Sequence, residues 1–395
     1  MLVTKQFRMS AVLASIVLCF FTVAQNLVYA THRISNLDRY VAPNGDDRND
    51  GSRQHPWATL RQASENVKPG YVVHVQPGIY SAAVSTSISG AAAARIRFVS
   101  EVKWGAVIRT AGAAAAWTND ADFVDIVGFD ISGDGYLGLF NRGSNVRIIA
   151  NHVHDVAANG CTGNGGAGIL NGKYSAGDND VIGNVVHNIG ENNKSCARVH
   201  GIYHSNLRGR IVNNISYGNE GYGIHLWHAA DQVIIANNLV FNNRHGGILV
   251  GAGDSPYNGE ASHPVDHVAV VNNIVIYNQN RYGVEELGVV GSSNQYMNNL
   301  VYRNHIADWK LLKGLQSGNI SEDPHFLDYR PDGNGNYRLP AGSPAVGRGT
   351  ALSAPKVDID GHARPPGGYD IGPYQTGTSS APLWPPEPCL PDCTD

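Results

Sequence analysis

The sequence has little positive charge and no long apolar stretch beyond its first thirty residues. Lys and Arg number 29 against 33 Asp and Glu, giving a net charge of −4 at neutral pH. A nucleic-acid surface needs clustered Lys and Arg, so this composition argues against nucleic acid as a partner. No segment after residue 30 is apolar enough to cross a bilayer, and we expect no membrane span. A carbohydrate or a small polar ligand fits this composition better.

Cysteine is also scarce, with five in 395 residues. The first, Cys19, lies in an apolar stretch that follows Lys5 and Arg8 and ends before Val28-Tyr29-Ala30. This order of charge, apolar run and small-residue cleavage site predicts a signal peptide over 1–30 and a secreted or periplasmic protein. Its removal would leave 27 basic and 33 acidic residues, a net charge of −6.

Export would permit disulfides among the remaining four cysteines. Cys161 and Cys196 lie in insertions at corresponding positions of neighbouring repeats, so adjacent coils could bring them together. Cys389 and Cys393 lie in a Pro-rich tail, where a disulfide, a metal pair and free thiols all stay open.

The dominant pattern is a repeated Asn that closes a Val- and Ile-rich run. Its spacings of 33, 30, 24, 35, 26 and 20 residues vary as solenoid repeats with inserted loops do. We expect the Asn side chains to tolerate unusual turn angles and to bond from one coil to the next. The aligned residues are Asn151, Asn184, Asn214, Asn238, Asn273, Asn299 and Asn319.

A second signature, Gly followed by an aliphatic residue, lies upstream of most of these Asn residues. Each unit therefore has two short β-branched runs, too short for helices and typical of strands. Stacked strands would build a continuous core, so we predict an all-β fold, a right-handed parallel β-helix. A short helix over Thr59–Val67 would cap its N-terminal end.

Two segments resemble known families. The opening residues Tyr40-Val41-Ala42-Pro43-Asn44-Gly45-Asp46 resemble the start of exported right-handed parallel β-helix repeat proteins, which include polysaccharide lyases and uronate epimerases. The tracts Asp323-Pro324-His325-Phe326 and Asp370-Ile371-Gly372 resemble the choice-of-anchor Q module behind many such bacterial proteins. We thus expect a signal peptide over 1–30, the β-helix with its cap over 31–330, a closing module over 331–375 and a tail over 376–395.

The Gly-aliphatic strands predict the position of a site. The aliphatic residue should point inward, so the next residue points outward. Long insertions on both flanks would wall a groove over this face. The outward set is Phe140, Leu170, Tyr203, His225, Leu249 and Glu285, followed two residues later by a second set that includes Trp227.

Tyr203 and His225 lie on neighbouring coils in this alignment, which predicts β-elimination from a uronic acid unit, or its epimerisation. One side chain would remove the proton beside the carboxylate and the other would donate a proton, while Lys173 neutralises the carboxylate. The resemblance to lyases and epimerases agrees with an acidic polysaccharide as the partner. The other predicted substrate-binding residues are Trp227, as a stacking platform, Arg244, His204, His228 and Glu285.

Four alternatives stay open. Glu285 could act with Asp254 or Glu260 as the carboxylate pair of a glycoside hydrolase, or the groove could bind glycan without cleaving it. His204 could be an inward turn residue, or it could hold a metal with His200 and His228, although no compact ligand motif is present. Calcium also stays open, at Asp178 and Asp180 or at Asp46, Asp47 and Asp50. We expect a monomer.

Overall fold

The computed structural model describes residues 37–158, 160–161, 165–190, 195–253 and 264–377. The described residues from Arg39 onward belong to one compact unit, and the structure below is that of this unit. The predicted signal peptide and the pair Cys389 and Cys393 lie outside the described residues.

The described chain forms three sheets in which neighbouring strands are parallel. Sheet A contains β1 (Asp38–Val41), β2 (Val72–Val75), β5 (Ile96–Ser100), β8 (Val124–Val127), β11 (Arg147–Ile149), β14 (Gly177–Ile182), β17 (Leu207–Val212), β20 (Val233–Ala236), β23 (Ala269–Val271), β26 (Gln295–Met297) and β29 (Leu315–Ser317). Sheet B contains β3 (Gly78–Tyr80), β6 (Ala106–Thr110), β9 (Asp130–Gly133), β12 (His152–His154), β15 (Val185–His187), β18 (Ile215–Tyr217), β21 (Leu239–Phe241), β24 (Ile274–Ile276) and β27 (Leu300–Tyr302). Sheet C contains β4 (Val84–Thr86), β7 (Ala115–Asn119), β10 (Leu137–Asn141), β13 (Gly166–Asn171), β16 (Val199–His204), β19 (Tyr222–Leu226), β22 (Gly246–Ala252), β25 (Tyr282–Gly288) and β28 (Ala307–Lys310).

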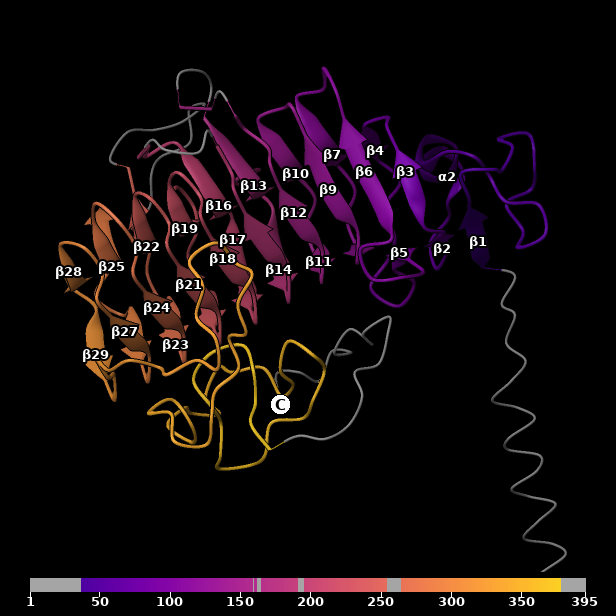
Figure 1. Cartoon of the computed structure of the whole chain (residues 1–395). Helices are drawn as coiled ribbons and strands as arrows, with labels where there is room; N and C mark the ends of the chain where they lie inside the picture. Colours follow the sequence, from indigo (N-terminus) through magenta and orange to yellow (C-terminus); the bar gives the residue numbers. More distant parts are fainter. Residues whose placement is uncertain (1–36, 159, 162–164, 191–194, 254–263, 378–395) are drawn as a thin grey trace, which may run out of the picture. The chain divides into compact units, whose positions relative to one another are not determined.

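Each coil contributes one strand to sheet A, one to sheet B and one to sheet C, in that order. Successive coils place equivalent strands side by side, as Figure 1 shows. The predicted right-handed parallel β-helix is therefore confirmed. Among the described residues, no helix is both long enough and apolar enough to cross a membrane.

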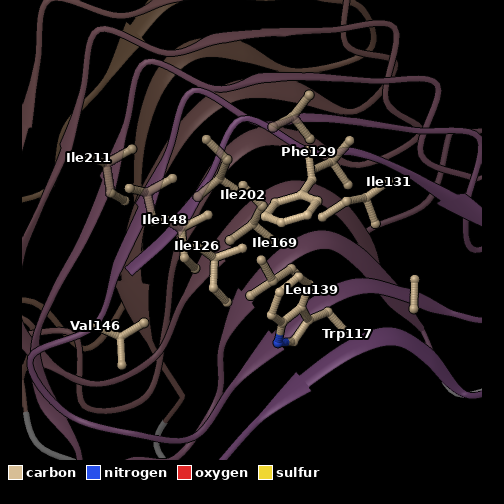
Figure 2. Packing of buried hydrophobic residues seen from close by; sticks show 14 of the residues in the cluster. Trp117, Ile126, Phe129, Ile131, Leu139, Val146, Ile148, Ile169, Ile202 and Ile211 are labelled. Atoms are coloured by element: carbon tan, nitrogen blue, oxygen red, sulfur yellow. The ribbon is translucent and has the colours of Figure 1, made fainter. Parts of the chain in front are cut away.

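The core fills the space between the three sheets. Inward aliphatic residues repeat from coil to coil, as in the series Ile169, Ile202, Ile224 and Ile248, all fully buried. Near the N-terminal end the ring of Trp117 packs edge-on against that of Phe129, with centroids 5.2 Å apart, among aliphatic side chains (Figure 2). Stacking thus buries apolar surface that one coil could not bury alone.

The repeated Asn residues form the predicted ladder between sheets A and B. The side-chain oxygen of Asn184 accepts hydrogen bonds from the backbone N–H and the side-chain amide of Asn151, at 2.8 and 3.0 Å. The same pair of bonds recurs along the stack through Asn319. The prediction about backbone angles was wrong in its position, because the positive φ belongs to the preceding residue, as at Asn213 with φ of 57°.

Two further ladders strengthen other corners of the coil. One contains Asn219, Asn243, Asn278 and Asn304, and it ends on the carboxylate of Asp308. The other contains Asn119, Asn141 and Asn171, and it ends on His204. Fully buried amides are satisfied along all three lines, which removes the cost of burying them.

Helix α2 (Leu60–Asn66) is the predicted N-terminal cap. The hydroxyl of Thr59 accepts from the N–H of Gln62 at 3.1 Å, and this N-cap begins the helix. Asp47 holds Thr59 in place through its backbone N–H and its hydroxyl. Leu60 and Ala63 join the main core, so the helix closes the first coils.

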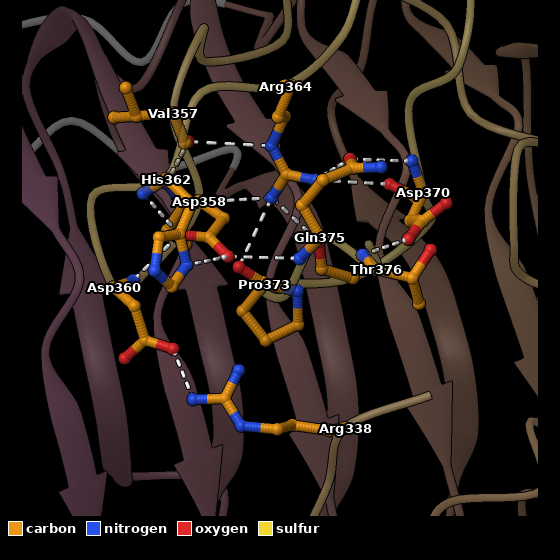
Figure 3. A network of polar contacts seen from close by, with 12 residues as sticks. Arg338, Val357, Asp358, Asp360, His362, Arg364, Asp370, Pro373, Gln375 and Thr376 are labelled. Atoms are coloured by element: carbon orange, nitrogen blue, oxygen red, sulfur yellow. Dashed lines mark hydrogen bonds and ion pairs between the residues drawn. The ribbon is translucent and has the colours of Figure 1, made fainter. Parts of the chain in front are cut away.

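The segment over 326–377 has no named strand and packs against the outer face of sheet B. Tyr337, Leu339 and Ile371 form a second apolar cluster with the outward residues Tyr217 and Phe241. Within the segment, Arg364 donates to the carbonyls of Gly372 and Pro373, and Asp358 accepts from backbone N–H groups (Figure 3). The segment therefore covers one side of the stack, while Leu315 of the last coil stays 66% exposed.

The last coil is held by Glu286, which points into the core. Its carboxylate accepts from the N–H groups of Leu312, Lys313 and Gly314 at 2.7 to 3.1 Å. The Tyr296 hydroxyl donates to the same carboxylate at 2.9 Å. The buried carboxylate of Glu286 is thus satisfied by the backbone N–H groups that follow β28 and by the Tyr296 hydroxyl.

Candidate active site

A groove of about 640 Å³ lies on the outer face of sheet C. It opens over β16, β19, β22 and β25, in the C-terminal half of sheet C. Two arginines line it, together with four histidines, three aromatic rings and small or aliphatic residues. The described lining residues are Gly165, Ala197, Arg198, His200, Tyr203, Tyr222, His225, Trp227, His228, His245, Leu249, Arg281 and Leu287.

The strand register agrees with the predicted alignment of outward residues. Phe140 pairs with Leu170, Leu170 with Tyr203, and Tyr203 with His225. The row continues through Leu249 and Glu285 to Lys310. The Gly-aliphatic repeat therefore placed the outward row correctly.

The rings of Tyr203 and His225 stack face to face, with centroids 4.7 Å apart and planes 11° apart. This is one strand spacing, as expected for neighbours in a parallel sheet. Tyr203 is half-buried, whereas His225 is 8% exposed at the floor of the groove. Two of the three residues predicted as catalytic, Tyr203 and His225, thus lie together.

His200 is the direct polar partner of His225. Its Nε2 lies 2.7 Å from Nδ1 of His225. The backbone N–H of Tyr222 donates to Nδ1 of His200 at 3.4 Å, so this nitrogen carries no proton. Neutral His200 then donates from Nε2 to His225, and neutral His225 keeps its own proton on Nε2.

Both imidazoles are neutral at physiological pH. Burial lowers the pKa of His200 to about 3 and that of His228 to about 4. Burial, followed by the neighbouring imidazoles of His200, His228 and His245, holds the pKa of His225 well below 6.5. The resting floor of the groove therefore presents an N–H donor and carries no imidazolium charge.

Trp227 and His228 extend the groove beyond β19. The ring of Trp227 lies over glycines, because a Cβ on Gly251 would come within 2.7 Å of it. His228 stacks on Tyr174, with centroids 4.4 Å apart. A flat indole next to His225, with centroids 5.6 Å apart, suits the face of a sugar ring.

Glu285 is fully buried beneath one end of the groove and is already bound by donors. Arg281 donates to both of its carboxylate oxygens, Tyr222 donates at 3.1 Å, and Lys310 lies 3.4 Å away. This carboxylate fixes Arg281 and does not face the groove as a free acid or base. Its predicted roles in substrate binding and hydrolysis are therefore corrected; Asp254 and Glu260 lie outside the described residues.

Three other predicted residues lie away from the groove lining. Lys173 is exposed but does not line the groove, and Arg244 does not line it either. His204 is fully buried inside the coil, where its Nδ1 lies 3.0 Å from the amide of Asn171 and its Nε2 lies 3.2 Å from the carbonyl oxygen of Arg208. The prediction that His204 contacts substrate was wrong, since the strand alternation turns it inward.

Sequence reasoning assigned no role to the two arginines of the groove. Arg198 immediately precedes β16 and is exposed at the rim, and Arg281 immediately precedes β25. Both positions directly precede a Gly-aliphatic strand, so a search for cations at the start of these strands would have found them. His245 was missed in the same way; its Nδ1 lies 2.8 Å from the Ser195 hydroxyl.

The disulfide predicted as one alternative is present. Cys161 and Cys196 are bonded, with Cα atoms 5.7 Å apart. They link the segments that lead into β13 and β16, directly before the groove residues Gly165 and Arg198. The disulfide thus fixes one wall of the groove.

The two Asp clusters considered for calcium are paired with cationic or backbone groups. Asp178 binds Arg208, and Asp180 binds Arg210, both at 2.7 Å. Asp46 binds Arg48, while Asp47 caps the start of α2. Guanidinium groups at these positions oppose a bound cation.

Comparisons with known proteins support the fold and give no family for the whole chain. Residues 43–87 match a family described as protein of unknown function (DUF1565). The uncharacterized protein YwoF of Bacillus subtilis (strain 168) is 33% identical over 82 residues, which is 21% of this chain and 17% of that protein. The chain thus matches less than a fifth of the length of this curated relative.

Two solved structures similar to this chain are lyases by name, and the first of them shares the architecture. The pectate lyase Pel9A superposes with a TM-score of 0.56 at 19% identity, covering 86% of this chain and 96% of that one. A rhamnogalacturonan lyase gives a TM-score of 0.47 at 16% identity over 78% of this chain and 96% of that one. The chain is a parallel β-helix protein. At these identities the comparison establishes the fold alone, and the resemblance of the C-terminal segment to a choice-of-anchor Q module stays a prediction.

Proposed function

We propose that this parallel β-helix protein is an exported, polysaccharide-active enzyme of the lyase type, acting on an acidic, uronate-containing glycan. The lining of the groove carries the proposal, because Arg198 is exposed at its rim and the described lining contains no carboxylate, while Arg281 is paired with Glu285 beneath the groove. Guanidinium groups bind carboxylates, and the aromatic rings beside them suit sugar rings. A neutral imidazole pair provides proton transfer at the same place.

In β-elimination, a base removes the proton beside the carboxylate, the bond to the leaving sugar oxygen breaks, and that oxygen gains a proton. His225 presents Nε2–H at rest, so we assign it the donor role, with His200 holding its tautomer. Tyr203, after its hydroxyl proton has passed to solvent, accepts the proton from the sugar as a phenolate, and His225 regains its Nε2 proton from solvent after the product leaves. Arg198 neutralises the carboxylate in place of the predicted Lys173. Epimerisation would share the first step and return a proton to the opposite face.

The fold adds support by analogy only. The pectate lyase Pel9A has the same architecture, but a fold can carry unrelated activities. The open groove on one side of the stack gives a polymer room to bind along sheet C. We propose that the polysaccharide occupies this groove and that the protein acts as a secreted or periplasmic monomer.

Activity against a panel of acidic and neutral polysaccharides tests the reaction class. A lyase gives unsaturated products that absorb in the near ultraviolet, and only from acidic glycans. New reducing ends without that absorbance would favour a hydrolase, and an inverted uronate without chain cleavage would favour an epimerase. Binding without turnover would favour a glycan-binding protein.

The variants Tyr203→Phe and His225→Ala test the site. Each should lower kcat at least ~100-fold, the scale of a lost proton-transfer group. Tyr136→Phe, which changes an exposed tyrosine next to β10 outside the groove lining, should keep full activity. If both groove variants also keep full activity, the chemistry lies elsewhere.

Variants of Arg198 test whether this arginine binds the substrate carboxylate. Arg198→Ala should weaken activity on acidic glycan at least ~10-fold. The matched change Arg142→Ala removes an exposed arginine that is paired with Asp120, and it should have no effect. An Arg198→Ala enzyme with unchanged activity would contradict the assignment of this cation.

A further inference from the structure

A cluster of imidazole and carboxylate groups lies on the outer face of sheet B, on a different sheet from the groove. Asp130 on β9 pairs in register with His152 on β12, and His154 on β12 pairs with His187 on β15. These four side chains, here called the imidazole cluster, come from three successive coils. None of them lines the groove.

The polar atoms of the cluster converge on one another. One carboxylate oxygen of Asp130 lies 2.7 Å from Nδ1 of His152, and the other lies 3.2 Å from Nε2 of His154. Nε2 of His152 lies 2.8 Å from Nε2 of His187. One potential ligand atom each from Asp130, His152 and His154 lie within 4.8 Å of one another.

Stacking alone does not explain these contacts. Further along the same face, Tyr217, Phe241 and Ile276 occupy the position of His154 and His187, and these apolar groups are buried beneath the C-terminal segment. The imidazole cluster instead keeps 15 to 21% exposure at Asp130, His152 and His154. Aromatic hydrocarbon rings would pack equally well at these positions.

Aromatic rings flank the imidazole cluster, and a further carboxylate contacts one of its histidines. Trp104 stacks on His152 with centroids 4.7 Å apart, and Tyr217 stacks on His187 at the same distance. Asp155 lies 2.7 Å from Nδ1 of His154, so a carboxylate can orient this ring from its far side. Histidine ligands of metals commonly have such an outer carboxylate.

We propose that the imidazole cluster is a binding site for a transition-metal dication such as Zn²⁺, with Asp130, His152 and His154 as ligands and His187 beside them. Ligand atoms about 2.0–2.1 Å from a tetrahedral Zn²⁺ lie roughly 3.3 Å apart. The three potential ligand atoms, now within 4.8 Å of one another, would need to approach by no more than about 1.5 Å to reach this geometry. Two carboxylates, Asp130 and Asp155, balance the charge of the ion. Imidazole nitrogens favour zinc, nickel or copper over calcium or magnesium.

Calorimetric titration of purified, untagged protein with ZnCl₂, CoCl₂ and CaCl₂ in turn tests the proposal. One Zn²⁺ should bind per chain, Co²⁺ should give a visible ligand-field band, and Ca²⁺ should not compete. His152→Asn and His154→Asn should each lower Zn²⁺ affinity at least tenfold. Thermal unfolding in EDTA shows whether each variant is folded.

Two control variants separate this site from other histidines. His74→Asn changes a half-buried histidine stacked on Tyr40 in the first coils, and His225→Ala changes the groove. Both should bind Zn²⁺ as the unaltered protein does. Absence of Zn²⁺ binding, or binding that the His152→Asn/His154→Asn double variant retains while His225→Ala loses it, would overturn the proposal.

Discussion

The direction in which a strand points each side chain decides whether that residue lies in the core or in the groove. His204 and Tyr203 are adjacent in sequence, yet one ends a buried amide ladder and the other lies in the groove. The alternation of the strand could be predicted, and it placed Tyr203 and His225 correctly. The tautomer of His225 could not be predicted, because it depends on a backbone N–H of Tyr222 and on His200.

His204 makes stability depend on pH. Burial lowers its pKa from 6.5 to about 4, so the unfolded chain binds a proton that the folded chain excludes as pH falls from 6.5 towards 4. The contribution of His204 to the free energy of unfolding is therefore fully present above pH 6.5 and falls as the pH drops below 6.5. At pH 5 the loss from this residue is about 2 kcal/mol. His204→Asn, which continues the Asn ladder, should reduce the loss between pH 7.5 and 5 by that amount.

Chemical unfolding at the two pH values measures this difference. His267→Asn changes an exposed histidine and serves as the control, with the pH dependence of the unaltered protein. Equal slopes for His204→Asn and the unaltered protein would contradict the account of a neutral buried His204.

At the scale of elements, the sequence predicted the strands and the cap but missed how their ends are fixed. The Gly-aliphatic repeat marks β16 and β25, whereas Arg198 and Arg281 act from the residues just before them. Glu285 looked free in sequence because Lys310 reaches it only through the register of β25 and β28, and because Arg281, four residues earlier, pairs with it from just before β25. Charge pairing across coils therefore limited the prediction of the site.

The disulfide between Cys161 and Cys196 should matter for the groove as well as for stability. Replacing both cysteines by Ala should lower the free energy of unfolding by about 2–4 kcal/mol. The segment carrying Arg198 should also become less fixed, which raises KM for acidic glycan more than it lowers kcat. Steady-state kinetics with and without reductant measure this.

Reductant should change the unaltered protein in the same direction and leave the double variant unchanged. A double variant with the original KM would show that the remaining contacts hold this wall without the disulfide.

For the whole molecule, the repeat predicted the stack but did not predict where the C-terminal segment lies. The Gly, Pro and Asp residues of the C-terminal segment form turns and do not indicate which strands the segment packs against. Only the structure shows that Tyr337 contacts Phe241 on sheet B. Arg364 joins the two parts, donating to Asn213 at 3.0 Å while 4% exposed. Burial lowers the pKa of Arg364 to about 10.

Arg364→Met should release the segment from the stack. The carbonyls of Gly372 and Pro373 and the side chain of Asn213 would lose a donor, at a cost of roughly 2–4 kcal/mol. Limited proteolysis should then cleave within 326–377 before the coils unfold. Arg330→Met removes an exposed arginine of the same segment and should change stability by less than ~0.5 kcal/mol; equal proteolysis of the two variants would refute the role of Arg364.

The three amide ladders have a mechanical consequence. Their hydrogen bonds run from each coil to the next, in the same direction as the bonds between strands. A force that pulls the ends of the stack apart would load sheet and ladder bonds of one coil junction together and then pass to the next junction. Such a chain should extend in a series of steps, each releasing one coil, and the junction closed by Cys161 and Cys196 should interrupt the series.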